Sequence, residues 1–170
     1  ATRLSGSAVA AFMNPGGIRA DLTYASSPVG EGDGNVTYGE AFTVQPFGNS
    51  LVTMTLTGAQ IEALLEQQWT TANRMLQVSN GFTYQWSASA PAGSKVDVAS
   101  ILISGVPISP SGTYRVTVNS FLADGGDNFL VLKDGTNRLG GAVDTDALEA
   151  YFVAHSPVAP GPQNRITQIP

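Results

Sequence analysis

The chain has 170 residues, a net charge of −5 and no cysteine; 42% of its residues are hydrophobic and 12% are charged. This length and composition predict one domain with a packed core. The lack of cysteine excludes a disulfide scaffold and a thiolate metal site, and the lack of a basic run argues against a nucleic-acid polymer as partner. No apolar run approaches the roughly 20 residues that a membrane-spanning helix needs.

Short apolar runs alternate with loop signals in the first part of the chain. Residues 7–13 form an apolar run that predicts a buried strand, and Asn-Pro-Gly-Gly at residues 14–17 predicts the loop that ends it. Residues 26–35 contain a proline and three glycines and are expected to form an exposed loop. Residues 41–44 are interpreted as a short strand that Pro46 closes.

The strongest local signal follows. Threonines alternate with apolar residues over residues 51–57, which is the period of a half-buried strand. Thr57 and Gln60 have the spacing of a capping box, so a helix is expected to begin after Thr57. The apolar face of this helix is expected to contain Ile61, Leu64, Leu65 and Trp69.

The remaining segments are mostly short strands. Apolar or alternating patterns predict strands at residues 82–86, 96–98, 101–103, 114–118, 129–132 and 163–169. A helix is expected to be capped by Asp144 or Thr145 and to end near His155, with an inward face of Leu148, Tyr151 and Phe152. Two main helices among many strands, without regular β-α-β alternation, predict an α+β fold: a single domain with a mixed or antiparallel sheet.

Few residues of the chain could perform catalysis. The single histidine, His155, is expected at the exposed end of a helix. No group of His, Asp and Glu has metal-ligand spacing, and there is neither a Walker phosphate loop nor a Gly-x-Ser-x-Gly elbow. We therefore expect the chain to hydrolyse no substrate by itself, even with added divalent metal.

Three clusters combine polar or aromatic side chains with glycine, at residues 14–19, 45–49 and 120–127. In the first, two glycines allow a close approach to a ligand, while Asn14 and Arg19 offer hydrogen-bonding groups suited to phosphate or ribose oxygens. In the third, Phe121 could stack on a base while Asp127 accepts hydrogen bonds from a ribose. The alternative is an ordinary turn in the first cluster, with both phenylalanines of the other clusters in the core and Asp127 capping a turn.

Four motifs occur in order along the chain: Asn-x-Gly-Gly-Ile-Arg from residue 14, Pro-Phe-Gly-Asn from 46, Thr-Gly-x-x-Ile from 57 and Asn-x-Phe-Leu-Ala-x-Gly-Gly-Asp from 119. Together they resemble the C-terminal domain of the 5'-nucleotidases, a family that includes UDP-sugar hydrolases and cyclic-nucleotide phosphodiesterases. The resemblance extends from residue 9 to about residue 166. It implies that residues 1–170 are the nucleotide-binding domain of such a hydrolase.

The resemblance implies roles for individual residues. Phe47 and Phe121 match two aromatics that sandwich the base and are expected to face each other across a cleft. Asp127 matches a carboxylate that binds the ribose hydroxyls, and Arg19 matches an arginine directed at the sugar and phosphate. Asn73 stands where a glycine often lines the base pocket, a departure that bears on base preference. The substrate-binding residues implied in this way are Asn14, Gly17, Arg19, Phe47, Asn49, Phe121 and Asp127.

The resemblance also implies partners for the domain. A pair of divalent metal ions, such as Zn or Mn, would belong to an N-terminal metallophosphatase domain that is absent from this chain. The expected ligand is a nucleoside monophosphate or a related nucleotide. The expected location is extracellular, cell-surface or periplasmic, with a secretion signal upstream, because residues 1–3 contain none. Two alternatives stay open: a non-catalytic surface or adhesion module with the same fold, and a hydrolase of nucleotide-sugars or other phosphoesters.

Overall fold

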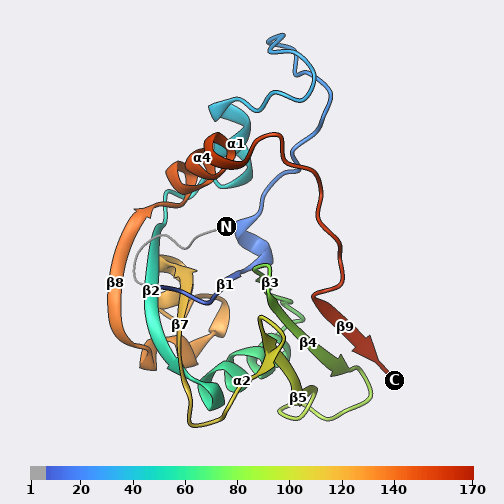
Figure 1. Cartoon of the computed structure of the whole chain (residues 1–170), viewed down its shortest axis with the longest axis vertical. Coiled ribbons are helices and arrows are strands. Elements are labelled where there is room, and N and C mark those ends of the chain that lie inside the picture. The colour runs from blue at the N-terminus through green and yellow to red at the C-terminus, as the bar shows by residue number, and fades with distance from the viewer. Residues whose placement is uncertain (1–6) are drawn as a thin grey trace.

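The computed structural model describes residues 7–170, so the expectation about residues 1–3 lies outside the described part. Two mixed sheets form within it (Figure 1). In the first sheet β1 is parallel to β7 and the other neighbouring pairs are antiparallel. Its strand order is β3 (Gln77–Val78), β1 (Ala10–Met13), β7 (Thr113–Asn119), β2 (Ser50–Thr57) and β8 (Thr136–Val143).

The second sheet is smaller, and in it β4 and β9 are parallel. Its strand order is β6 (Val106–Pro107), β5 (Val96–Ile103), β4 (Phe82–Ser87) and β9 (Ile166–Ile169). The two strands expected at residues 96–98 and 101–103 are one continuous strand, β5. Edge strand β8 was not predicted, because all its residues are exposed and no apolar alternation marks it.

The helices are few and short, and both predicted main helices are confirmed. α2 has the expected capping box: the Thr57 hydroxyl accepts from the Gln60 backbone amide, and the Gln60 side-chain oxygen Oε1 accepts from the Thr57 backbone amide. α4 has the expected limits, but its N-cap is Val143 and no side chain caps it. The α-helices are α1 (Tyr38–Val44), α2 (Gly58–Glu66), α3 (Ser120–Ala123) and α4 (Asp144–His155). The 3₁₀ helices are η1 (Pro15–Gly17), η2 (Gln67–Trp69), η3 (Gly126–Asn128) and η4 (Leu130–Asp134).

Two segments expected to be strands are helical instead. Residues 41–44 belong to α1, whose first turn is closed by a capping box between Thr37 and Glu40. Residues 129–132 enter η4, directly after a tight turn in which Asp127 and Asn128 have left-handed backbone (φ 54° and 67°). In both places a local turn-forming group outweighs the strand preference of a short apolar run.

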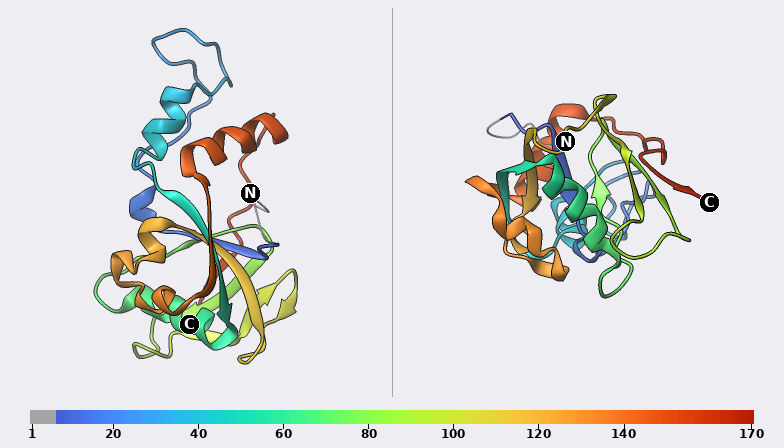
Figure 2. Two further views of the ribbon diagram at one scale, coloured as in Figure 1. Left: turned by 90° about the vertical axis from the view of Figure 1, so that its left-hand side faces the viewer. Right: turned by 90° about the horizontal axis from the view of Figure 1, so that it is seen from below.

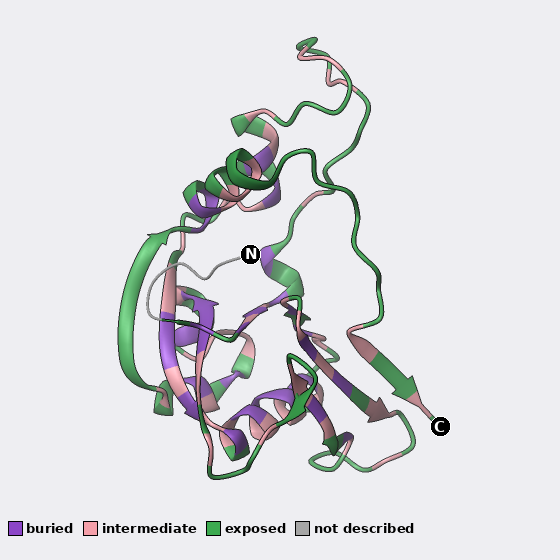
Figure 3. Cartoon of the chain, in the orientation of Figure 1, coloured by how far each residue is buried: buried purple, intermediate pink, exposed green. Residues whose placement is uncertain are grey.

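The hydrophobic core lies between the two sheets and α2, where buried residues gather in Figure 3. Phe12 of β1 and Phe82 of β4 meet edge to face with ring centroids 5.0 Å apart, which joins the sheets. The expected α2 face is fully buried at Ile61, Leu64 and Leu65. Trp69 is half-buried and belongs to η2 rather than α2. Its ring packs on that of Trp86 of β4, with the ring centroids 5.1 Å apart.

Helices α1 and α4 lie together at one end of the molecule, away from this core (Figures 1 and 2). The loop of residues 26–35 projects beyond them and is mostly exposed, as expected. Leu148, Tyr151 and Phe152 of α4 are only half-buried. Within residues 7–170, none of the helices combines the length and the apolar character that crossing a membrane requires.

Candidate functional site

The three sequence clusters meet at one edge of the first sheet. β1 and β7 run parallel and end there, and β2 starts there, because Leu51 of β2 pairs with Asn119 at the end of β7. The cluster at 14–19 follows β1, the cluster at 45–49 precedes β2, and the cluster at 120–127 follows β7. The sheet register therefore brings three segments that are distant in sequence to the same place.

A chain of buried amides joins two of these clusters. The Nδ2 group of Asn119 donates to Oδ1 of Asn14 at 3.0 Å, and Nδ2 of Asn14 donates to Oδ2 of Asp127 at 2.9 Å. Asn119 also caps α3, because its Oδ1 accepts from the Leu122 amide at 2.8 Å. Asn14 and Asn119 are both buried, so each needs these partners. The network fixes the position of the Asp127 carboxylate relative to the end of β1.

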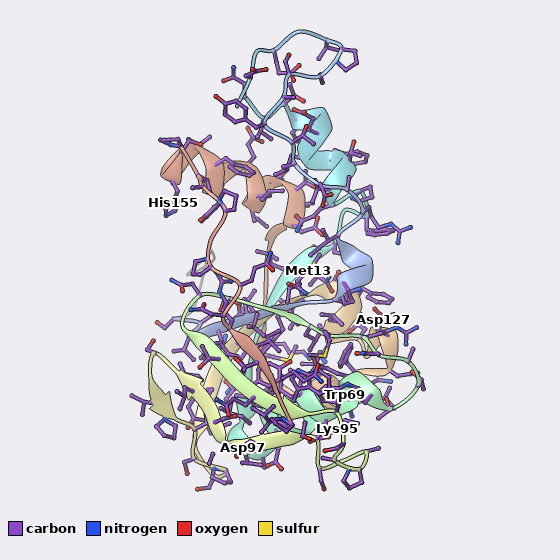
Figure 4. All side chains as sticks on the ribbon, turned by 90° about the vertical axis from the view of Figure 1, so that its right-hand side faces the viewer. Met13, Trp69, Lys95, Asp97, Asp127 and His155 are labelled. Carbon is purple, nitrogen blue, oxygen red and sulfur yellow. The ribbon has the colours of Figure 1, made fainter. Side chains whose placement is uncertain are left out.

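Figure 4 shows Asp127 beside the end of β1, near Met13, whereas His155 lies on the separate helix α4. Asp127 has a second partner that the sequence did not indicate: Nε of Arg74 lies 3.5 Å from its Oδ1. The carboxylate thus has one oxygen toward an amide and the other toward a guanidinium. His155 is exposed, and its Nδ1 is 2.9 Å from the Tyr151 carbonyl oxygen, which confirms its expected place at the helix end.

The two phenylalanines are exposed, which overturns the alternative that both belong to the core. Phe47 is 56% exposed and Phe121 is 45% exposed. The Arg19 guanidinium lies over the Phe47 ring, 5.8 Å from its centroid, and donates to the Gly16 carbonyl at 3.3 Å. Single exposed aromatic rings are ordinary on a protein surface, so the exposure of Phe47 and Phe121 gains weight only from their position where the three clusters meet.

Glycines leave room for the side chains of the site. A Cβ at Gly126 would lie 2.5–2.6 Å from three atoms of the Phe121 ring, so that ring rests directly on the Gly126 backbone. Gly17 is buried, and a Cβ there would lie 2.5 Å from Cε of Met13 and 2.9 Å from Oδ1 of Asn14. Gly17 therefore supports Asn14 by giving it space.

Asn49 links the second cluster to the third. Its Oδ1 accepts from the Ser120 hydroxyl at 3.3 Å, and its backbone oxygen accepts from the Asp144 amide at 2.8 Å. The structure thus places Asn49 next to the residue that precedes Phe121. Burial raises the pKa of the neighbouring Asp144 carboxyl.

Two contributors are not among the predicted binding residues: Asn119, although it begins the fourth motif, and Arg74. A signal existed for Asn119, because asparagine directly before a short helical motif is a typical N-cap. Arg74 had none, since its contact with Asp127 spans two loops. The site offers aromatic faces, amides, one carboxylate and two guanidinium groups, which suit binding. In the described part of the chain, no group of three or more His, Cys, Asp or Glu side chains could hold a metal ion.

Comparison with known proteins identifies the family to which this fold belongs. The family model for the 5'-nucleotidase C-terminal domain matches residues 1–134. The chain belongs to the 5'-nucleotidase C-terminal domain family. The cell wall protein Lmo0130 of Listeria monocytogenes is 38% identical over 80% of this chain and 17% of its own length. An apyrase of Tabanus yao is 33% identical over 91% of this chain and 29% of its own length. A 5'-nucleotidase of Vibrio cholerae is 30% identical over 87% of this chain and 24% of its own length.

Solved structures agree with this assignment. The 5'-nucleotidase precursor of Thermus thermophilus superposes with a TM-score of 0.78 at 38% identity, covering 95% of this chain and 32% of that one. The NAD nucleotidase of Haemophilus influenzae has a TM-score of 0.74 at 20% identity, covering 96% and 30%, and shows the shared fold alone. These relatives are much longer proteins, and the domain spans less than a third of the length of each.

Proposed function

We propose that the domain is the nucleotide-recognition part of a secreted, metal-dependent hydrolase of the 5'-nucleotidase type. In this proposal Phe47 and Phe121 stack on the two faces of the base, Asp127 accepts from the ribose hydroxyls, and Arg19 meets the phosphate. The observation that carries the proposal is the meeting of three sequence clusters at one sheet edge, with both aromatic rings exposed there.

The local chemistry of each group supports its proposed role. An exposed aromatic ring binds a base mainly by stacking, at about 1–3 kcal/mol per contact. Arg19 already lies against the Phe47 ring, so a base stacked on Phe47 would bring its phosphate toward a guanidinium. The Asp127 carboxylate accepts a hydrogen bond from Asn14, and its remaining acceptor positions suit hydroxyl donors. Asn49 joins the segments that carry the two rings.

The catalytic step is proposed to take place on another domain. Because residues 7–170 contain no cluster of three or more potential metal ligands, this part of the chain offers no place for a divalent metal pair. We propose that a metallophosphatase domain elsewhere in the full protein supplies it, and that the present domain brings the nucleotide there. A secreted or cell-surface location accords with the relative named a cell wall protein.

The proposal is tested by NMR titration of the 170-residue chain with adenosine and with AMP. We expect a dissociation constant of about 0.1–10 mM, because two stacking contacts and a few hydrogen bonds must offset the loss of ligand freedom. AMP should bind less than about tenfold more tightly than adenosine, since Arg19 alone is proposed to meet its phosphate. Shifts should be confined to the regions of Asn14, Phe47 and Phe121 and should disappear in Phe121→Ala.

A non-catalytic surface or adhesion module is the second candidate, favoured by the same cell wall relative. Scattered shifts, or none, in the titration would support it over nucleotide recognition. The sequence upstream of the domain separates the two independently. Asp-x-His and Gly-Asn-His-(Asp/Glu) motifs there would indicate a metallophosphatase domain, and their absence would favour the module.

A further inference from the structure

Arg74 occupies a place in the site that neither the motifs nor the family assignment explains. Its Nε atom pairs with Oδ1 of Asp127 at 3.5 Å, while Nδ2 of Asn14 donates to Oδ2 of the same carboxylate at 2.9 Å. Side-chain exposure is 36% for Arg74 and 20% for Asp127, so the pair lies at the rim of the site and is only partly screened by water. One carboxylate oxygen therefore accepts a hydrogen bond from Asn14, and the other lies beside the Arg74 guanidinium as its ion-pair partner.

The loop that carries Arg74 is itself well anchored. The backbone amide of Arg74 donates to the carbonyl of Gln68 at 2.9 Å. Gln68 is fully buried; its Oε1 accepts from the Leu76 amide at 2.7 Å, and its Nε2 donates to the Leu65 carbonyl at 2.8 Å. The segment on both sides of Arg74 is thus fixed to the core by one buried glutamine.

The same loop also forms a hydrogen bond with the turn that carries Asp127. The Thr71 hydroxyl accepts from Nη1 of Arg74 at 3.2 Å and from Nδ2 of Asn128 at 3.3 Å. Asp127 and Asn128 both have left-handed backbone, which aspartate and asparagine adopt more readily than most residues but which contacts with neighbouring segments help to hold in place. Arg74 and Thr71 provide part of that hold from one side, and Asn14 provides it from the other.

We propose that Arg74 is a positioning residue that orients the Asp127 carboxylate for a ribose diol and so makes the site select ribonucleosides over deoxyribonucleosides. This inference rests on the proposed nucleoside site. An ionised carboxylate offers about four acceptor positions. Asn14 occupies one with its hydrogen bond, and the Arg74 guanidinium lies beside the other oxygen, which leaves at least two positions for the two donors of a 2',3'-diol. A carboxylate held at both oxygens cannot turn to form a new hydrogen bond when one hydroxyl is missing. A nucleoside that lacks the hydroxyl therefore loses the whole contribution of that hydrogen bond to its binding.

The test compares adenosine with 2'-deoxyadenosine, because both are uncharged and differ only at the hydroxyl in question. For the unmodified chain we expect adenosine to bind at least about tenfold more tightly, the value of one hydrogen bond to a charged group. In Arg74→Ala this preference should fall below about threefold, and the affinity for 2'-deoxyadenosine should change little because the stacking contacts remain. Arg74→Lys should restore part of the preference, since it keeps the charge but not the planar guanidinium.

The control is Lys133→Ala, which removes one positive charge from the neighbouring segment η4; Lys133 is exposed and belongs to neither ion pair found in residues 7–170. It should leave the preference unchanged. Arg74→Gln serves as a second variant should Arg74→Ala lose its folded NMR spectrum. An unchanged preference in a folded Arg74 variant, or tighter adenosine binding, overturns the positioning role.

Failure of the underlying proposal looks different. If the unmodified chain binds neither nucleoside, or if Phe121→Ala binds as well as the unmodified chain, then the nucleoside site itself is wrong. If the unmodified chain binds adenosine, Phe121→Ala abolishes binding and the Arg74 variants keep the preference, then only the role of Arg74 is wrong.

Discussion

Replacing Gly126 with alanine is expected to damage the site while sparing the fold. A Cβ at Gly126 would lie 2.5 Å from Cε1, 2.6 Å from Cδ1 and 2.6 Å from Cζ of Phe121, all closer than carbon atoms approach without displacement. Gly126 is not among the residues with positive φ, so alanine itself meets no backbone strain there. The Phe121 ring must therefore move, and being 45% exposed, it can do so at little cost.

The size of the effect follows from the contact that is lost. Removing one stacking face costs about 1–3 kcal/mol, which raises the dissociation constant for adenosine by about 5- to 150-fold. The free energy of unfolding in urea should stay within about 1 kcal/mol of the unmodified chain, because alanine lowers the entropy of the unfolded state and the displaced ring is at the surface.

The assay is an adenosine titration followed by NMR, with urea unfolding on the same samples. Gly140→Ala is the matched control, since the same Cβ at Gly140 of β8 would meet no atom within 4 Å and the φ of Gly140 is likewise not positive. It should alter neither binding nor stability appreciably. Undiminished adenosine binding by folded Gly126→Ala would refute the stacking role of Phe121, and a large loss of stability would refute the claim that the ring moves freely.

Two further predictions concern the core. Leu65→Ala should lower the free energy of unfolding by about 2–5 kcal/mol, because Leu65 of α2 is fully buried. Leu22→Ala, at a 39% exposed position, should lower it much less. Equal losses in urea unfolding would contradict the assigned core. Burial raises the pKa of Tyr84 to about 12, so the folded state favours the neutral phenol; stability is then fully present below the unfolded value near 10 and is lost as the pH rises toward 12. Tyrosinate absorbance should show one tyrosine ionising about two pH units after the others and absent in Tyr84→Phe, and ionisation of all five together would contradict this.

The parts of the fold that could be predicted are those in which local chemistry and tertiary structure agree. The Thr57–Gln60 capping box correctly predicted the start of α2. The same pattern at Thr37 and Glu40 marks the start of α1, so the strand predicted at residues 41–44 is wrong even though the capping signal lies in the sequence. β8 could not be found, because an edge strand exposed at every residue has no apolar alternation.

The site was predictable only through the motifs. Asn14 and Asp127 are 113 residues apart, and their hydrogen bond depends on the register of β1, β7 and β2, which no local pattern specifies. The resemblance supplied the set of residues, and the structure brings the segments that carry them to one edge of the first sheet. Neither local sequence patterns nor the resemblance predicts the Arg74–Asp127 contact. It joins two irregular loops whose paths depend on the hydrogen bonds of Gln68 and on the left-handed turn at Asp127.

The central claim, that a nucleobase binds between Phe47 and Phe121, is tested most directly by intermolecular nuclear Overhauser effects in the adenosine complex of the 170-residue chain. These effects report protons within about 5 Å, and a base stacked at carbon contact distance on both rings lies well inside that range. We predict effects from the adenine H2 and H8 protons to the ring protons of both Phe47 and Phe121. Effects to only one ring, or to residues outside the sheet edge where the three clusters meet, would contradict the claim.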